Sequence, residues 1–378
     1  MPVPPLPFDD IRKKQAITLI VKITSGCNFL CRYCDADIYS NKIMSTTVLE
    51  SLVKNTLLTQ RNVQFIWHGG EPLIAGLDFF KTAIKLQRQF ASKGQIITNS
   101  IQTNGSLLTK QWVDFFKDNK FSVGISIDGP SILHDLNRVY KNGSATHDSV
   151  TRGIQLIKEA GMKFGTISVI TKDTEKLGAE EFLNFFIRNG ISSMALNMQN
   201  PALNVGREDE VGVDGYSKFL IDLFDIWYKN NDPTIRIREF NAIIRGFLYK
   251  KPNFCILAGN CFGRYFAIDT HGRAYHCDEF MFDSNYLLGD VTSTPFEDII
   301  TNEKMQKLID ENNNDLSKSE CKWSKICNGG CPKRRYVMKR AMKTIPTCCG
   351  WSKVISHIHS KLIEDRRLDE HIIKIMSN

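Results

Sequence analysis

The stretch Cys27-Asn-Phe-Leu-Cys31-Arg-Tyr-Cys34 places three thiols in a CxxxCxxC spacing, just after an apolar segment with the pattern of a β-strand, residues 17–23. Thiolates are the usual ligands of iron–sulfur clusters, and three at this spacing can converge on one cluster. A structural zinc ion would need a fourth protein ligand, and no other Cys or His lies near enough in the sequence to supply it. The stretch therefore predicts a cluster in which one iron is left for a ligand or substrate.

The composition is that of a globular protein of a reducing compartment. The chain has 378 residues, 42% hydrophobic and 24% charged, which suffices for one large α/β domain and a smaller one. Its eleven cysteines are grouped in tight motifs, so we expect them to bind metal in the cytoplasm and not to form disulfides. The net charge of +8 is scattered, which predicts no nucleic-acid partner. No signal-peptide pattern and no bilayer-spanning apolar run is present, so no membrane association is expected.

Strand-like and helical segments alternate through the first half of the chain. Runs rich in β-branched and aromatic residues predict strands, and the amphipathic segments between them predict helices. Successive β-α units imply a parallel sheet with helices outside, either an open doubly wound sheet or a partial barrel. The predicted strands are 17–23, 62–68, 96–102, 121–127, 162–170 and 193–197, and the predicted helices are 46–60, 77–93, 109–119, 145–160 and 177–189, followed by a helix at 216–229 and a boundary at 230–233.

Polar and glycine-rich motifs follow four of these strands. The cysteine stretch follows the first strand, His68-Gly-Gly-Glu-Pro72 the second, Gln102-Thr-Asn-Gly105 the third and Ser126-Ile-Asp-Gly-Pro130 the fourth. In open parallel sheets and in barrels, ligands bind at the carboxyl ends of the strands. The shared position of the four motifs therefore predicts one binding site at this edge, with the glycines allowing close approach of a ligand and Glu71 offering a carboxylate to an ammonium group.

These motifs resemble the radical S-adenosylmethionine (radical SAM) superfamily, whose defining motif is CxxxCxxC with an aromatic residue before the third Cys, here Tyr33. The resemblance implies a partial (β/α)6 TIM-like barrel over residues 17–232, after an N-terminal lead of residues 1–16. It also implies that Cys27, Cys31 and Cys34 hold a 4Fe-4S cluster whose open iron binds SAM. In that superfamily the cluster passes SAM an electron, and a 5'-deoxyadenosyl radical results.

The resemblance implies a set of SAM contacts as well. The GGEP motif would hold the methionyl amine, two polar residues would lie near the ribose or the carboxylate, and an arginine would pair with that carboxylate. Taken singly, these residues could equally be a turn hydroxyl, an Asx-turn and a surface charge. The implied cofactor-binding residues are Gly69, Gly70, Glu71 and Pro72 at the amine, Asn104 and Ser126 at the ribose or carboxylate, Arg138 at the carboxylate, and Tyr33 with the backbone near Leu196 and Asn197 at the adenine.

The second half of the chain holds eight cysteines, in a pattern too long and dense for one zinc site. Residues 262–269 and 272–277 read as a β-hairpin turning at 270–272. The spacing Cys261-x10-Gly272-x4-Cys277, followed by Cys321-x5-Cys327-x3-Cys331, closely resembles the SPASM domain of radical SAM enzymes that modify peptides. That domain carries two auxiliary 4Fe-4S clusters, and the resemblance assigns it residues 233–350, with a C-terminal helical segment over 351–378.

Both auxiliary clusters receive their ligands through this resemblance. Cluster I would take Cys255, Cys261, Cys277 and Cys331. Cluster II would take Cys321, Cys327 and Cys349, but Lys318 stands where its first Cys is expected. A lysine ammonium is a poor iron ligand, so the fourth position would be filled by Cys348, a water, another side chain or the substrate.

Asp278 is the candidate catalytic residue. It follows Cys277 directly, and in sulfatase-maturing relatives an Asp in this place acts as general base. A carboxylate beside a buried anionic cluster would have a raised pKa, which suits a base, although a hairpin-turn Asp that accepts backbone hydrogen bonds is an equally good interpretation. His68 at a strand end and His276 in the hairpin are expected to be structural.

The first functional hypothesis is a radical SAM/SPASM peptide maturase that abstracts a hydrogen from a peptide side chain and then oxidises or crosslinks it, because Trp67-His68-Gly-Gly-Glu-Pro-Leu73 looks like the cyclophane-forming maturases of ribosomal peptides. The alternative is an anaerobic sulfatase maturase that forms formylglycine, a family that usually has Gln before GGEP and a complete CxxC. A multi-zinc scaffold without enzymatic activity is the third.

The expected partners follow from the first two hypotheses. They are a peptide or protein substrate and an electron donor such as flavodoxin or ferredoxin. Only 16 residues precede the first strand, too few for a leader-binding domain, since stable small domains need more than about 40 residues. A peptide leader would therefore be recognised by the second domain, by rim loops or by a separate leader-binding protein.

Overall fold

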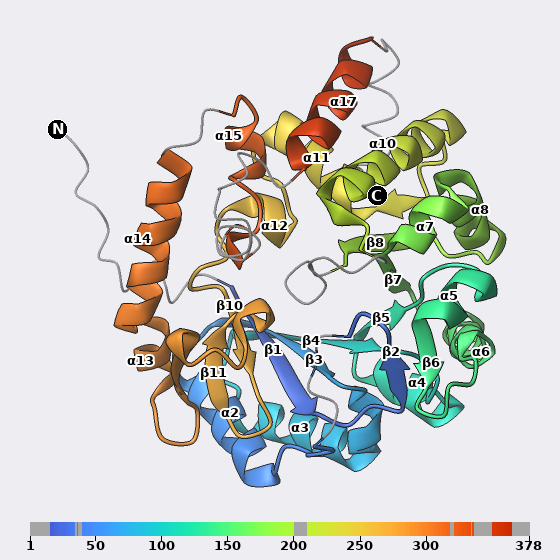
Figure 1. Cartoon of the computed structure of the whole chain (residues 1–378). Coiled ribbons are helices and arrows are strands. Elements are labelled where there is room, and N and C mark those ends of the chain that lie inside the picture. Colours follow the sequence, from blue (N-terminus) through green and yellow to red (C-terminus); the bar gives the residue numbers. More distant parts are fainter. Residues whose placement is uncertain are drawn as a thin grey trace.

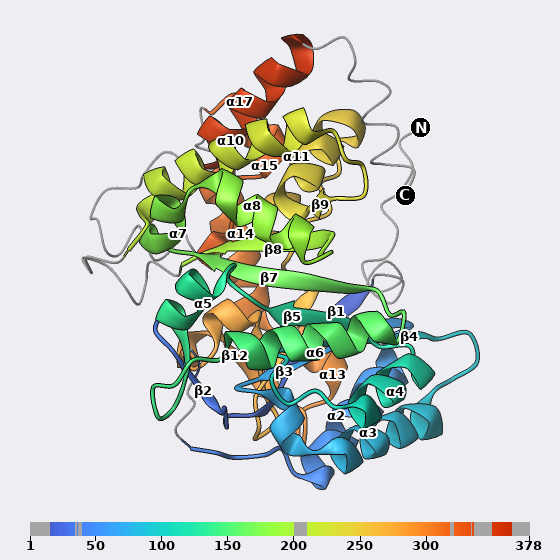
Figure 2. The same ribbon diagram turned by 90° about the vertical axis from the view of Figure 1, so that its right-hand side faces the viewer.

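The computed structural model describes residues 16–34, 36, 40–199, 210–317, 321–333, 335 and 350–364. Six parallel strands form the predicted sheet in the order β1, β3, β4, β5, β7, β8, and helices cover its outer face (Figures 1 and 2). All six predicted strands are confirmed within two residues at each end. They are β1 (Ile17–Thr24), β3 (Asn62–Gly69), β4 (Ile96–Thr103), β5 (Ser122–Ser126), β7 (Phe164–Ile170) and β8 (Ser193–Met198).

The helices between the strands follow the amphipathic pattern of the sequence. The helix predicted at 177–189 is divided, because Gly178 adopts φ 87° and separates two shorter helices. A further helix, α5, follows Pro130 and was not predicted, since its seven residues are too few to show periodicity. The helices are α2 (Thr46–Thr59), α3 (Leu77–Phe90), α4 (Lys110–Asp118), α5 (Ser131–Asn137), α6 (His147–Glu159), α7 (Lys172–Leu177), α8 (Ala179–Arg188) and α10 (Gly212–Asn230), with the 3-10 helix η1 (Pro72–Ala75).

The predicted hairpin of the second half extends the same sheet. Strand β10 (Tyr265–Ile268) pairs in parallel with β1, with Thr18 opposite Tyr265. Strands β11 (Arg273–His276) and β12 (Leu287–Asp290) then continue antiparallel. The sheet thus has ten strands among the described residues, with β9 (Arg236–Ile237) beside β8 at its other end (Figure 1). The hairpin and its turn were predicted, but its attachment to β1 was not, because sequence does not reveal which strand edge is open.

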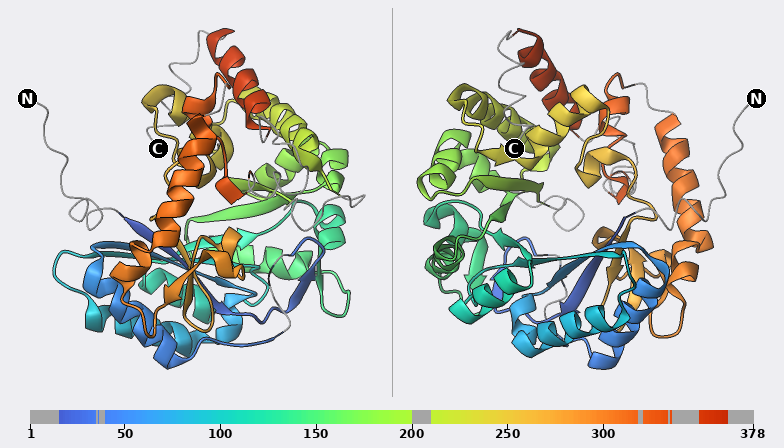
Figure 3. Two further views of the ribbon diagram at one scale, coloured as in Figure 1. Left: turned by 60° about the vertical axis from the view of Figure 1, so that its left-hand side comes forward. Right: turned by 180° about the vertical axis from the view of Figure 1, so that it is seen from behind.

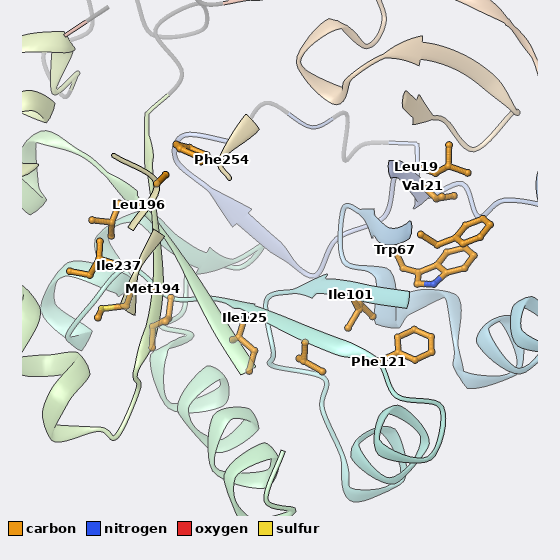
Figure 4. Packing of buried hydrophobic residues seen from close by; sticks show 14 of the residues in the cluster. Leu19, Val21, Trp67, Ile101, Phe121, Ile125, Met194, Leu196, Ile237 and Phe254 are labelled. Atoms are coloured by element: carbon orange, nitrogen blue, oxygen red, sulfur yellow. The ribbon is translucent and has the colours of Figure 1, made fainter. Parts of the chain in front are cut away.

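One face of the strands supplies the core. Along β1, Leu19, Val21 and Ile23 are fully buried, whereas Thr18 and Lys22 on the opposite face are partly exposed. This alternation is the two-residue period of a strand, so the apolar face packs under the helices and the polar face lines the inside of the barrel. Figure 4 shows the apolar side chains from β1, β3, β4, β5, β8 and β9 gathered in one layer.

The C-terminal part of the described chain packs on the barrel end. Helix α17 (Trp351–Glu364) lies along α10 (Figure 3), where Lys353 Nζ is 2.7 Å from Asp214 Oδ1 and His357 Nε2 is 2.6 Å from Asp225 Oδ1. The rest of the predicted C-terminal helical segment, beyond residue 364, lies outside the described residues. The other helices are α11 (Arg238–Tyr249), α12 (Cys255–Ala258), α13 (Phe296–Ile300), α14 (Glu303–Ser317) and α15 (Ser324–Cys327), with η2 (Asp278–Phe280) and η3 (Ser284–Tyr286).

The domain boundary after Asp232 stays a prediction, although β9 beyond it pairs with β8 in the barrel sheet. None of the described helices combines the length and apolar character needed to cross a membrane.

Candidate active site

The cysteine loop and the GGEP loop are joined through their backbones. The N–H of Gly70 donates to the carbonyl of Thr24 at 2.8 Å, and the N–H of Glu71 donates to the carbonyl of Gly26 at 2.8 Å. A Cβ at Gly69 would lie 2.3 Å from the Thr24 oxygen, and one at Gly70 would lie 2.2 Å from the Gly26 oxygen. The sequence predicts that these glycines allow a ligand to approach closely. In the structure they allow close approach of residues 24–26, which lead into the cysteine stretch, and this contact fixes the cysteine loop beside the ends of β1 and β3.

Replacing Gly70 with Ala should displace the cysteine loop, because its Cβ would overlap backbone atoms that cannot rotate away. Overpacking of this kind costs about 1–3 kcal/mol of the free energy of unfolding. We expect a lower Tm and loss of iron bound by the first three cysteines, measured by thermal unfolding and iron analysis of reconstituted protein. The control is Gly165→Ala, where the nearest atom would be Ser193 Oγ at 3.6 Å, an ordinary contact. Equal iron content in the two variants would contradict this account.

The carboxylate of Glu71 is engaged in hydrogen bonds inside the protein. The residue is fully buried; its Oε1 accepts hydrogen bonds from Leu73 N at 3.0 Å and Thr103 Oγ1 at 2.6 Å, and its Oε2 accepts from Asn104 N at 2.7 Å. Burial raises its pKa to about 7, although these three hydrogen bonds act in the opposite direction. In the structure this carboxylate ties the ends of β3 and β4 together, and its predicted contact with an ammonium group stays a prediction.

Asn104 also acts on the cysteine loop. Its Nδ2 donates to Asn28 Oδ1 at 2.8 Å, and Asn28 Nδ2 donates to Ser106 Oγ at 2.9 Å. Asn28 lies between the first two cysteines, so this network fixes the loop from the β4 side. Sequence reasoning missed Asn28 and Ser106, the other two residues of this network. The position of Asn28 inside the cysteine motif was a usable signal.

The thiols of Cys27 and Cys31 are partly buried, and that of Cys34 is exposed. Burial raises the pKa of Cys27 to about 11 and that of Cys31 to about 12, and each of these thiols is further affected by the charge of Cys34. Buried thiols become thiolates only when a positive charge compensates them, as bound iron does. The buried guanidinium of Arg138 lies opposite Cys31 in a two-stranded ribbon, and its positive charge favours the thiolate form of Cys31. The donor set and its surroundings therefore fit an iron–sulfur cluster. The ribbon pairs β2 (Phe29–Cys31) with β6 (Arg138–Tyr140).

Arg138 and Tyr33 both converge on a carboxylate that sequence reasoning did not select. Arg138 Nε and Nη2 donate to the two oxygens of Asp128 at 3.0 and 3.2 Å, and Tyr33 Oη donates to Asp128 Oδ2. Asp128 is fully buried, and Val169 N also donates to its Oδ1, at 3.0 Å. In the structure the guanidinium of Arg138 forms an internal ion pair with Asp128, and its predicted pairing with a ligand carboxylate stays a prediction. Asp128 stands in the motif after the fourth strand, which was the available signal.

The remaining predicted SAM contacts differ in the hydrogen bonds that they already make within the protein. Ser126 Oγ accepts from Gln102 Nε2 at 3.0 Å on the inner face of the sheet. The backbone of Leu196 is already hydrogen-bonded, because its N–H donates to Glu239 Oε1 at 3.1 Å and its carbonyl accepts from Tyr216 Oη at 2.7 Å. Its predicted place at the adenine stays a prediction. The side chain of Asn197 accepts from Arg238 Nη2 at 2.8 Å.

The four cysteines assigned to auxiliary cluster I lie in one region. Burial raises the pKa of Cys255 to about 11, that of Cys261 to about 12 and that of Cys277 well above its usual range, and all three are affected by the charge of Cys331. Among the described residues no group of three or more Cys, His, Asp or Glu side chains is close enough to hold a single metal ion. A shared region for these four thiols is what their assignment to one cluster requires.

Auxiliary cluster II can be followed only in part. Cys321 and Cys327 lie on either side of one turn, where Ser324 N donates to the Cys321 carbonyl at 2.9 Å. Cys327 is buried and Cys321 is partly exposed. Lys318, Cys348 and Cys349 lie outside the described residues, so the predicted fourth ligand stays a prediction.

A cavity of about 450 Å³ lies where the strand ends meet the second half of the chain. Such a volume suits a small ligand or a short peptide segment. Its walls come from β1 and β3, the loop after the cysteines, the hairpin turn and η2. The charged and glycine residues that line it include Lys22, Lys42, Gly69, Gly70, Asp278 and Glu279.

Asp278 is held in this cavity by an ion pair with Lys22, at 3.3 Å between Nζ and Oδ2. Burial alone would raise the pKa of Asp278, but the charges of Lys22 and His68 and the hydrogen bonds from Cys277 and Lys22 lower it overall. The prediction of a raised pKa assumed a neighbouring anionic cluster and stays a prediction. The protein's own residues lower the pKa of Asp278, because Lys22, which the sequence analysis did not consider, lies beside it. Asp278 is ionised at neutral pH and accepts protons as a carboxylate.

The two histidines near the site are neutral. Burial and the nearby Lys22 lower the pKa of His68 to about 4, and burial lowers that of His276 to about 4. His276 stacks on Phe262 with ring centres 4.5 Å apart, which fits the predicted packing role in the hairpin. His68 Nδ1 lies 2.7 Å from Gly69 N and 3.3 Å from Lys22 Nζ, so it is connected to the candidate base through Lys22.

Comparison with known proteins places this arrangement among enzymes. The radical SAM superfamily model matches residues 21–186, and the SPASM model, an iron-sulfur cluster-binding domain, matches residues 260–332. The cysteine-type anaerobic sulfatase-maturating enzyme of Clostridium perfringens (strain 13) is 32% identical over 333 residues, which are 84% of this chain and 90% of that protein. The serine-type enzyme of Bacteroides thetaiotaomicron is 31% identical over 351 residues, 85% and 84% of the two chains. The structure of native anSMEcpe with bound AdoMet and Cp18Cys peptide matches with a TM-score of 0.84 and 30% identity, over 93% of this chain and 98% of that chain.

Proposed function

This chain belongs to the radical SAM superfamily and carries a SPASM domain, and from its similarity to the two sulfatase-maturating enzymes we propose that it oxidises a Cys or Ser side chain of its substrate to the aldehyde of formylglycine. As a member it is a peptide-modifying enzyme that uses SAM and 4Fe-4S clusters. The observation that carries the finer proposal is Asp278, an ionised carboxylate in the cavity beside Cys277. Membership in an enzyme superfamily argues against the multi-zinc scaffold.

The SAM-binding cluster is proposed to be held by Cys27, Cys31 and Cys34. The contacts in the protein narrow how SAM would be bound, because Glu71 and Arg138 already use their charged groups inside the protein. The amine of SAM is therefore proposed to meet backbone oxygens of the segment 69–72. Tyr33, Asn104, Ser126 and Asn197 remain proposed neighbours of its adenosine and carboxylate, and the backbone of Leu196 is the least suitable of the predicted set.

The role of this chain's own residues in the reaction is to accept a proton. When bound, SAM with its cluster supplies the abstraction of one hydrogen atom from the substrate Cβ, and an auxiliary cluster accepts the electron that the resulting carbon radical gives up. Asp278 is proposed to accept the thiol or hydroxyl proton that leaves with that electron, so that a carbon–sulfur or carbon–oxygen double bond forms. A thioaldehyde would then add water and lose hydrogen sulfide to give the aldehyde. General-base assistance of this kind contributes about 10²–10⁴-fold to a rate.

Crosslink formation in a ribosomal peptide is the second candidate. His68 favours it, because sulfatase maturases usually have Gln at this position and this chain has a neutral His connected to Lys22. In that case the carbon radical or cation would be trapped by a second side chain of the peptide, and not converted to an aldehyde.

Turnover of the Cp18Cys peptide tests the proposal. Reconstituted enzyme, SAM and dithionite under anaerobic conditions should produce an aldehyde on the peptide, detected by hydrazide labelling and mass spectrometry. The control omits SAM. A peptide that loses two hydrogens, takes up no hydrazide and resists fragmentation between two residues would establish the crosslink instead.

Auxiliary cluster II is proposed to exist in spite of Lys318. Fully reconstituted enzyme should then bind about twelve irons, as three clusters of four. The double variant Cys321→Ala and Cys327→Ala should lose about four of these irons, measured by iron and sulfide analysis. A count near eight in the parent protein, unchanged in the variant, would show that these two thiols serve another purpose.

The proposed partners complete this function. An external donor of the flavodoxin or ferredoxin type is proposed to reduce the SAM-binding cluster in the cytoplasm. Recognition of any peptide leader is proposed for the second domain, for rim loops or for a separate leader-binding protein. The two domains are proposed to span residues 17–232 and 233–350.

A further inference from the structure

Lys22 connects the two halves of the enzyme at the candidate base. It extends from the inner face of β1, and its Nζ lies 3.3 Å from Asp278 Oδ2, 256 residues further along the chain. Its backbone partner across the sheet is His68 of β3, whose Nδ1 lies 3.3 Å from the same Nζ. The ammonium group is thus placed between one residue of the barrel sheet and one of the SPASM segment.

The contacts of His68 determine its tautomer. Nδ1 is 2.7 Å from the N–H of Gly69 and 3.3 Å from Lys22 Nζ, and both groups can only donate. The carbonyl of Gly69 is also near, at 3.2 Å, but the contact to the N–H is shorter. Nδ1 is therefore the acceptor and the proton is on Nε2. The low pKa of this imidazole, about 4, keeps it neutral, so that it accepts from the ammonium and does not repel it.

We propose that Lys22 is a positioning residue, which holds the carboxylate of Asp278 in the cavity with its own ammonium fixed by His68. This inference rests on the proposed role of Asp278 and adds the residues that orient it. The carboxylate also lies 3.3 Å from Cys277 Sγ, but a thiolate that ligates a cluster has no proton to donate to it. An ion pair with a lysine that is not itself fixed would then leave the carboxylate free to rotate about its two side-chain torsions. A lysine that is itself fixed by a second partner restricts that rotation, and a misplacement of about 1 Å lowers a rate by about 100-fold.

The experiment compares Lys22→Met, Lys22→Arg and Lys42→Met in reconstituted enzyme. The readout is the number of 5'-deoxyadenosine molecules released for each Cp18Cys peptide modified, together with kcat and KM. Lys22→Met should lower kcat for peptide modification by about 100-fold, with 5'-deoxyadenosine release and iron content retained, so that the ratio rises. Lys22→Arg keeps a hydrogen-bond donor for Asp278. Its ratio of 5'-deoxyadenosine to modified peptide should therefore lie between those of Lys22→Met and the parent enzyme.

The control variant removes the same charge from the same cavity. Lys42 lines it too, but its nearest polar side-chain contact is His271 Nε2 at 3.3 Å and it does not reach Asp278. Lys42→Met should therefore keep the parent ratio of 5'-deoxyadenosine to modified peptide. A ratio that rises equally in Lys42→Met and Lys22→Met would overturn the inference, because it would reflect cavity charge and not position.

A double-mutant cycle separates this inference from the proposed function. If Lys22 acts through Asp278, the variant with both Lys22→Met and Asp278→Asn should modify peptide no more slowly than Asp278→Asn alone. A further loss by the full factor of the single Lys22 variant would overturn the inference and leave the role of Asp278 intact. If Asp278→Asn alone kept the parent ratio of 5'-deoxyadenosine to modified peptide, Asp278 would not be the base, and Lys22 would have no base to position.

Discussion

Replacement of Cys27, Cys31 and Cys34 together by Ala should abolish release of 5'-deoxyadenosine while the iron of the later cysteines is retained. The reason is position: among the described cysteines, these three belong to the loop that is joined to the GGEP loop by the hydrogen bonds of Gly70 and Glu71. The measurement is anaerobic reaction with SAM and dithionite, with chromatography of the products and iron analysis of the same sample.

Two outcomes would be informative here. The matched control is the pair Cys321→Ala and Cys327→Ala, which should still release 5'-deoxyadenosine because those thiols lie in the SPASM segment. Deoxyadenosine release by the triple variant would assign the SAM-binding cluster to other cysteines. Complete loss of iron from the triple variant would show that the loop is needed for the folding of the second half.

Replacement of Asp278 by Asn should separate SAM cleavage from peptide oxidation. The amide keeps the shape of the side chain and can still contact Lys22, but it cannot accept a proton as a carboxylate does. We expect the rate of peptide modification to fall by about 10²–10⁴-fold, while 5'-deoxyadenosine is still released. The two products are quantified from one anaerobic reaction, and the ratio between them is the readout.

Glu279 provides the control for that experiment. It is the next residue in the chain and lines the same cavity. Glu279→Gln removes the same charge near Cys277 and should leave the ratio of the two products close to that of the parent enzyme. Equal uncoupling in both variants would mean that the local negative charge matters and that Asp278 is not the specific proton acceptor.

The sequence by itself determined the elements of the barrel and the place of its motifs. The strand and helix periods are local properties, so the positions of β1, β3, β4, β5, β7 and β8 follow from the order of residues alone. Since parallel strands all end at one edge, the motifs after the first four strands were necessarily neighbours. The spacing of the cysteines likewise indicated clusters, because thiolate ligands near one another in sequence are near one another in space.

Only the tertiary structure decided which charged groups remain for ligands. Glu71, Arg138 and the backbone of Leu196 each have an internal partner, and those partners (Thr103, Asp128 and Glu239) are distant in sequence or were not selected. The attachment of the hairpin to β1 and the contact of Lys22 with Asp278 are also long-range. Such contacts depend on how elements pack in three dimensions, and no local pattern encodes them. The lowering of the pKa of Asp278 has the same origin, because Lys22, which contributes to it, lies 256 residues away in the sequence.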